Sequence, residues 1–222
     1  MTALRLAHRG DWRHAPENSL AAMVAAVRIP ACDGLEFDVR HSLDGVPIVL
    51  HDQTLARVQG LAVAAADLTA AELEPLGVPT LAAVVAAAGR RAFLDIELKE
   101  RPTDACLDVI AAGRGASNGG LDRAVISSFD RAALAVVAAG RPAWPRWLNS
   151  HDLEQATISG ATALGCTGIA AAWRAIDARS SGRVRDAGLE LVAFTVRRRT
   201  TFDRLARLGV MAVCVEAAAL DG

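Results

Sequence analysis

Acidic side chains alternate with apolar ones in two short segments of the sequence. Glu36 and Asp38 lie in the run GLEFDV at residues 34–39, and Glu97 lies in a second apolar run, two residues before Lys99. Alternate side chains of a strand share one face, so Glu36 and Asp38 point the same way, and a neighbouring strand can bring Glu97 to them. Alternating acids are common on solvated strand faces, but these lie within apolar runs that favour burial. Because converging carboxylates repel one another, the pattern predicts a site for a hard divalent cation such as Mg²⁺ or Ca²⁺.

Two histidines accompany these acids, each at the end of an apolar segment. His8 is followed by Arg9, and His51 is followed by Asp52. A pair of imidazoles on two sides of a phosphorus centre can remove one proton and supply another to a leaving alkoxide. Arg9 can complement the charge of a phosphate, and so can Lys99, the one lysine among 24 basic residues. A lone histidine is more often structural, but its coincidence with the acidic set favours phosphodiester chemistry.

The elements that must position these residues alternate along the chain. Short runs rich in Val, Ile, Leu and Phe predict strands, and the Ala-rich stretches between them predict helices. We expect strands at residues 4–8, 34–39, 92–98, 123–127, 146–149, 167–171, 189–196 and 211–215. We expect helices at residues 19–28, 81–88, 103–112, 131–139, 152–164, 177–187 and 200–208, with caps at Asn18 or Ser19, Thr80, Asp130, Asp177 and Thr200.

This alternation predicts a (β/α)8 TIM barrel that forms a single domain over residues 1–222. A doubly wound open sheet is the alternative, and the lack of a G-x-G-x-x-G motif after the first strand counts against it. Asp44-Gly45 is a hairpin signal, followed by an extended run at residues 47–50. Residues 53–79 then form a short insertion after the second strand, with a helix over 70–76. Functional side chains of such a barrel lie at the carboxyl ends of its strands, where both histidines and the three acids fall.

Composition narrows the classes of function. Basic residues number 24 and acidic residues 25, and a net charge of −1 gives no general attraction to nucleic acid or to an anionic membrane. Neither a signal-peptide pattern nor an apolar run of about 18 residues occurs, so we expect a cytoplasmic protein without a membrane span. The four cysteines are far apart and lack zinc-site spacing, which predicts reduced thiols.

The sequence resembles the glycerophosphodiester phosphodiesterase family in several motifs. In the family's order and spacing they are HRG at 8–10, PENS at 16–19, GLEFDV at 34–39, DGVP at 44–47, HDQTL at 51–55, PTL at 79–81 and IELK at 96–99. The resemblance implies a TIM barrel with a small insertion after the second strand. It also implies metal-dependent hydrolysis of a small-molecule glycerophosphodiester to glycerol 3-phosphate and an alcohol.

The resemblance also implies roles for the matched residues. His8 and His51 would form the acid/base pair, and the three acidic residues would bind the divalent metal. Arg9 and Lys99 would contact the phosphate, while Glu17 would support them from the loop after the first strand. Helix capping is the structural alternative for the segment around Glu17.

The resemblance is strong over residues 4–99 and weaker beyond. Glu216 stands where an Asp is usual, and Arg197 stands where a small polar residue is common. Phe194 and Trp173 lie near strand ends and can line a wall for the alcohol, although core packing explains them as well. These departures concern the far side of the pocket and leave the acid, histidine and cation set complete.

Three other classes of function are alternatives to this hydrolysis. A phosphodiester lyase would use the substrate's own hydroxyl and release a cyclic phosphate. A catalytically inactive barrel would act as a binding protein, although such a chain should lack one of the histidines or acids, and none is missing. A nucleic-acid-binding module needs a clustered basic face, whereas the only dense basic run is residues 197–199.

Overall fold

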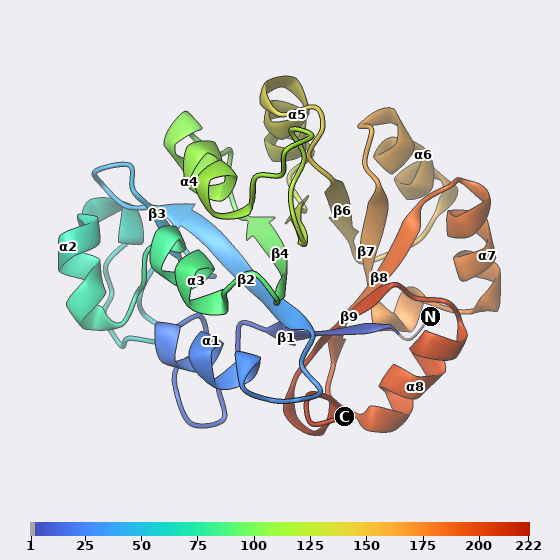
Figure 1. Ribbon diagram of the computed structural model, residues 1–222, viewed down its shortest axis with the longest axis horizontal. Coiled ribbons are helices and arrows are strands. Elements are labelled where there is room, and N and C mark those ends of the chain that lie inside the picture. The colour runs from blue at the N-terminus through green and yellow to red at the C-terminus, as the bar shows by residue number, and fades with distance from the viewer. Residues whose placement is uncertain (1–2) are drawn as a thin grey trace.

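The computed structural model describes residues 3–222, within which eight parallel strands close into a barrel (Figure 1). They are β1 (Leu4–His8), β2 (Gly34–His41), β4 (Phe93–Leu98), β5 (Ala124–Ser128), β6 (Arg146–Ser150), β7 (Gly168–Ala172), β8 (Glu190–Val196) and β9 (Ala212–Val215). Strand β1 pairs with β9 on one side and with β2 on the other, which closes the sheet. The closure confirms the predicted (β/α)8 barrel and excludes the open-sheet alternative.

Helices follow the barrel strands and cover the outside of the barrel (Figure 1). They are α1 (Leu20–Val27), α3 (Leu81–Ala88), α4 (Asp104–Arg114), α5 (Arg131–Gly140), α6 (Gln155–Ala163), α7 (Ala178–Asp186) and α8 (Arg199–Arg207). The predicted caps Ser19, Thr80, Asp130 and Asp177 each accept a hydrogen bond from a backbone N–H of the first turn.

The predicted starts of α6 and α8 are wrong, because residues 152 and 200 neither begin nor cap these helices. Asp152 accepts hydrogen bonds from the Thr157 hydroxyl and the Glu154 N–H, so the chain turns there and α6 starts only at Gln155. Thr200 is not a cap, because α8 already begins at Arg199. Its N-cap is Arg198, whose side chain makes no capping hydrogen bond within residues 3–222.

The insertion after β2 forms a small layer with its own apolar core. Strand β3 (Pro47–Val49) pairs antiparallel with β2, as the hairpin signal predicts. The chain continues through η1 (Ala65–Asp67), α2 (Ala70–Leu73), η2 (Glu74–Leu76) and back to α3. The helix predicted over 70–76 tightens to a 3₁₀ turn at its second half, where a proline lies near its start. Buried Leu55 and Leu73 belong to this core, which is separate from the apolar clusters of the barrel.

The barrel interior changes from apolar to polar along the strands. A buried apolar layer at the amino ends contains Leu6, Val125, Trp147 and Val192, with Trp147 stacked on Phe93 at 5.9 Å between ring centres. Two residues further along a strand, the side chain returns to the same face. The strands therefore carry polar side chains, such as His8 after Leu6, into the interior at their carboxyl ends.

None of the helices described between residues 3 and 222 has both the length and the apolar character needed to cross a bilayer. The four cysteines of the chain are free thiols. The cytoplasmic location stays a prediction.

Candidate active site

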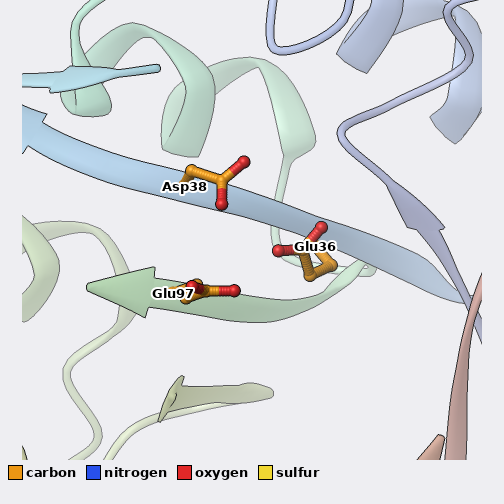
Figure 2. A group of neighbouring side chains, drawn as sticks. All are labelled: Glu36, Asp38 and Glu97. Carbon is orange, nitrogen blue, oxygen red and sulfur yellow. The ribbon is translucent and has the colours of Figure 1, made fainter. Parts of the chain in front are cut away.

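Three carboxylates from neighbouring strands converge inside the carboxyl end of the barrel. Asp38 on β2 lies in register with Glu97 on β4, and Glu36 lies two residues before Asp38 on the same face. One carboxylate oxygen of each residue lies within 4.8 Å of the other two. Figure 2 shows these side chains over the adjacent strands β2 and β4. The structure thus brings together the three acids that the sequence pattern grouped.

Burial of the acidic cluster makes ionisation of its carboxyl groups less favourable. Glu36 and Asp38 are 4% and 1% exposed, and Glu97 is 9% exposed. Burial, together with the charges of Asp38 and Glu97, raises the pKa of Glu36 well above its ordinary value. Burial also raises the pKa of Glu97. The pKa of Asp38 is lowered, because Arg9 and Lys99 outweigh the effect of burial on this carboxyl.

Two cations partly balance this charge. Lys99 Nζ lies 2.6 Å from Glu97 Oε1 and 3.5 Å from Asp38 Oδ1. Arg9 Nε lies 3.2 Å from Asp38 Oδ2, and Arg9 Nη1 donates a hydrogen bond to Glu17 at 2.8 Å. The two cations named from the sequence therefore lie against the acids.

The donor set of the cluster fits a hard divalent cation. Asp38 Oδ1 is buried and accepts no hydrogen bond from any residue that the structure describes. A buried carboxylate oxygen without such a partner is uncommon and leaves an acceptor for a ligand. All the donors are carboxylate oxygens, which suit this class of ion better than zinc.

His51 is held by a carboxylate that is itself held by an arginine. Its Nδ1 lies 2.6 Å from Asp52 Oδ1, and Arg57 Nε donates to Asp52 Oδ2 at 2.6 Å. The hydrogen bond from Arg57 lowers the pKa of Asp52 to about 2. Arg57 belongs to the insertion, and its Nη2 also donates to Glu17 at 2.6 Å. Burial lowers the pKa of His51, although Asp38 and Asp52 act in the opposite direction.

His8 is also held by a carboxylate that an arginine holds in turn, and both partners come from the C-terminal part of the sequence. Its Nδ1 lies 2.6 Å from Glu216 Oε1, and Arg197 Nε donates to Glu216 Oε2 at 2.6 Å. The other ring nitrogen, Nε2, lies 3.8 Å from Glu36 Oε2. Burial raises the pKa of Glu216, but the hydrogen bonds from His8 and Arg197 outweigh it and leave this pKa lowered.

Glu216 lies at the site beside His8, although the sequence marks it only as a departure from a family pattern. It follows Val215, which pairs with Ala7 at the seam between β9 and β1. The predicted barrel could have indicated this contact, because closure of a barrel places the residue after the last strand beside the end of the first strand. Glu216 and Arg197, the two departures near the end of the chain, hydrogen-bond to each other.

The segment before α1 supports the acids from the side. Asn18 does not cap the helix, since Ser19 accepts the capping hydrogen bond. Its backbone is left-handed, with φ of 59°, and its side-chain amide donates to Asp38 Oδ2 at 2.8 Å. Glu17 links Arg9 to Arg57, so it connects the acidic cluster with the insertion.

A cavity of about 380 Å³ opens over these residues, and its lining includes both histidines, Arg9, Glu36, Glu97 and Lys99. Phe129, His151 and Phe194 form its apolar side, with ring centres 5.1 to 6.2 Å apart. Trp173 is not part of this lining and borders a neighbouring pocket instead. Of the two aromatic residues named from the sequence, the structure places Phe194 at the cavity and Trp173 apart from it.

Comparison with known proteins agrees with this arrangement. The family model of the glycerophosphoryl diester phosphodiesterase family matches residues 8–220. The chain belongs to this family. The family resemblance of the sequence motifs is therefore confirmed, and the match extends over nearly all of the given sequence.

A curated relative matches part of the sequence. A glycerophosphodiester phosphodiesterase of Caldanaerobacter subterraneus is 35% identical over 113 residues, which are 45% of this chain and 46% of that relative. The matched segment thus spans less than half of that curated phosphodiesterase.

Solved structures align with the chain over nearly its full length. A phosphodiesterase of Oleispira antarctica, solved in complex with the product sn-glycerol-3-phosphate, has a TM-score of 0.84 and 25% identity, covering 96% of this chain and 93% of its own. A glycerophosphodiester phosphodiesterase of Thermotoga maritima has a TM-score of 0.80 and 22% identity, covering 100% and 96%. The second likeness, at 22% identity, shows the barrel fold alone.

Proposed function

We propose that the protein hydrolyses glycerophosphodiesters to sn-glycerol 3-phosphate and an alcohol. The observation that carries this proposal is the placement of two carboxylate-held histidines, His8 and His51, at one cavity with a cation-binding set of acids. Family membership over residues 8–220 supports the reaction class, and the product bound to the Oleispira antarctica relative supports the product.

Glu36, Asp38 and Glu97 hold Mg²⁺ or Ca²⁺ in this proposal. The bound cation supplies positive charge that stabilises the negative charge developing on the phosphoryl oxygens. Arg9 and Lys99 contact the phosphate as well, because they carry the cationic groups that already lie against the acids. Their partial burial keeps this attraction less screened by solvent.

The two histidines divide the proton transfers. Both Nδ1 atoms are engaged by carboxylates, which leaves Nε2 of each ring for the substrate. Burial lowers the pKa of His51, which favours the neutral form of this ring, and the neutral form suits removal of the proton from the attacking oxygen. His8 then donates a proton to the alkoxide that leaves when the phosphorus–oxygen bond breaks.

The alcohol half of the substrate packs against the apolar side of the cavity. Phe194 and Phe129 meet edge to face with ring centres 5.7 Å apart, and both line the cavity. Phe129 is 42% exposed, so part of its ring is available to a ligand. Trp173 contacts only the larger alcohols, because it borders the next pocket.

The test is an assay of glycerophosphoethanolamine and glycerophosphocholine with identification of the phosphorus product by NMR. The proposal predicts glycerol 3-phosphate. A cyclic glycerol phosphate would assign the lyase alternative instead, since the substrate's own hydroxyl would have attacked. If the folded, cation-loaded protein shows no turnover, the alternative of a catalytically inactive binding protein is favoured.

The variants His8→Ala and His51→Ala supply the second half of this test. Each should lower kcat by at least about a hundredfold, the contribution of one acid or base group. His14→Ala is the matched control, because His14 lies outside the cavity lining. Wild-type turnover in the double variant His8→Ala with His51→Ala would overturn the assignment.

A further inference from the structure

A second pocket of about 390 Å³ lies next to the cavity described above. Thr195, in β8, lines both of them. The second pocket is bordered by Trp173 and Arg174 from the turn after β7 and by Arg197 and Arg198 from the segment between β8 and α8. It therefore continues the cavity outward past the end of β8.

The charge of this pocket has one sign. Its lining holds three arginines and, in the part of the chain that the structure describes, no acidic side chain. Arg197 is neutralised by Glu216 at 2.6 Å. Arg174 and Arg198 form no ion pair with any residue from 3 to 222, although acidic residues are as numerous as basic ones in the sequence. The pocket is thus left with positive charge that the protein does not compensate.

One of the two arginines without an ion pair contacts an aromatic ring. The Arg174 guanidinium lies 4.4 Å from the centre of the Trp173 ring, where a cation–π contact stabilises it. Arg204 donates to the Ile176 carbonyl at 3.0 Å and so ties the end of the same turn to α8. Arg198 is the N-cap of α8, and the exposed amide groups of that helix end add to the positive potential.

We propose that this pocket is a subsite for a phosphate group carried by the alcohol half of the substrate. The inference rests on the proposed function, because that half is placed by the hydrolytic reaction. An alcohol held against Phe194 has Thr195 as its next neighbour along β8, and a phosphate beyond it meets Arg174 and Arg198. Guanidinium groups bind phosphate through charge-assisted hydrogen bonds. Arg198, the second residue of the basic run at 197–199, thereby acquires a role.

Glycerophosphoinositol and glycerophosphoinositol 4-phosphate test the subsite as a matched pair that differs by one phosphate. The measured quantity is kcat/KM for each compound with the cation-loaded protein. The double variant Arg174→Ala with Arg198→Ala removes the two unpaired arginines. The control is the double variant Arg28→Ala with Arg91→Ala, which also removes two exposed arginines. These two line a pocket at the amino end of β2, together with Asp33 and Gly34.

The wild-type protein should favour the phosphorylated compound by about tenfold, as expected for a few charge-assisted contacts at a partly exposed site. The subsite variant should lose most of this preference and keep its kcat/KM for glycerophosphoinositol, whereas the control should keep both. The equal net charge of the two variants separates local contact from general attraction.

Three results would overturn the inference alone. The first is equal kcat/KM for the two inositol compounds in the wild-type protein, and the second is a preference that persists in the subsite variant. The third is hydrolysis of glycerophosphoethanolamine with no hydrolysis of either inositol compound. Failure to hydrolyse any of these diesters would overturn the proposed function, and the subsite with it.

Discussion

His8 Nδ1 lies 2.6 Å from Glu216 Oε1, across the seam that joins the last strand of the barrel to the first. Glu216 in turn accepts a hydrogen bond from Arg197 at 2.6 Å. His51 has the same surroundings, with Asp52 and Arg57 in place of Glu216 and Arg197. A carboxylate on Nδ1 fixes the ring and its tautomer, so that Nε2 faces the substrate.

Replacing Glu216 should disturb His8 without removing it. Glu216→Gln loses the negative charge that orients the ring, so we expect kcat to fall by about tenfold to a hundredfold, part of what an acid–base group contributes. The KM for glycerophosphoethanolamine should change little, because Glu216 forms no ion pair with Arg9 or Lys99. Steady-state kinetics measures both constants, and Glu190→Gln at the amino end of β8 is the control.

A double-mutant cycle distinguishes this role from a structural one. In a His8→Ala background, Glu216→Gln should cause no further loss, since its effect passes through the missing ring. Equal losses in the two backgrounds would contradict the positioning role.

The Asp52 carboxylate should set the pH range of His51. Burial lowers the pKa of His51, and Asp52 partly opposes that shift by raising it. Asp52→Asn removes the raising influence, so the pKa of His51 should fall further. His51 accepts a proton only when unprotonated, and activity is lost as pH falls through its pKa. The acidic limb of kcat/KM against pH should therefore move to lower pH, and a limb that stays or moves upward would contradict the assignment of His51 as proton acceptor.

Asp95 is buried two residues before Glu97 on β4. Its ionisation should lower the free energy of unfolding as the pH rises. Burial raises its pKa to about 7 from an ordinary 3.8, although the Ser127 hydroxyl donates to it and acts in the opposite direction. Between these values the folded protein holds a proton that the unfolded chain has released. Stability should then fall by about 1.4 kcal/mol per pH unit as pH rises across this interval, and no further above it.

The variant Asp95→Asn isolates this contribution, because an amide cannot ionise and still accepts from Ser127. Urea unfolding with chelator present, at pH 5 and pH 8, should show a smaller loss of stability in the variant than in the wild-type protein. An identical pH dependence of the two unfolding free energies would show that Asp95 is ionised in the folded state.

The parts of the structure that follow local rules could be predicted from the sequence. Apolar runs gave the barrel strands within about two residues, because burial on both faces requires such runs. Caps such as Thr80 were found because a hydroxyl before a helical pattern satisfies free N–H groups. The grouping of Glu36, Asp38 and Glu97 followed from strand periodicity and parallel register.

Contacts between distant segments were harder to predict. Glu216 meets His8 only because the barrel closes, and the two residues are 208 positions apart. Arg57 reaches Glu17 across 40 positions from an insertion whose path no periodicity defines. Trp173 and Phe194 both lie near strand ends, but the direction of each turn, which decides the cavity that a side chain lines, is not encoded in a hydrophobic pattern.

The cation requirement tests the central claim most directly. Hydrolysis of glycerophosphoethanolamine is measured with protein freed of metal by a chelator and then titrated with Mg²⁺ or Ca²⁺, for the wild type and for Asp38→Asn. We predict that the chelated wild-type protein is inactive, that about one equivalent of cation restores it, and that Asp38→Asn needs far more. Full turnover by chelated protein, with metal analysis showing no bound ion, would contradict the account.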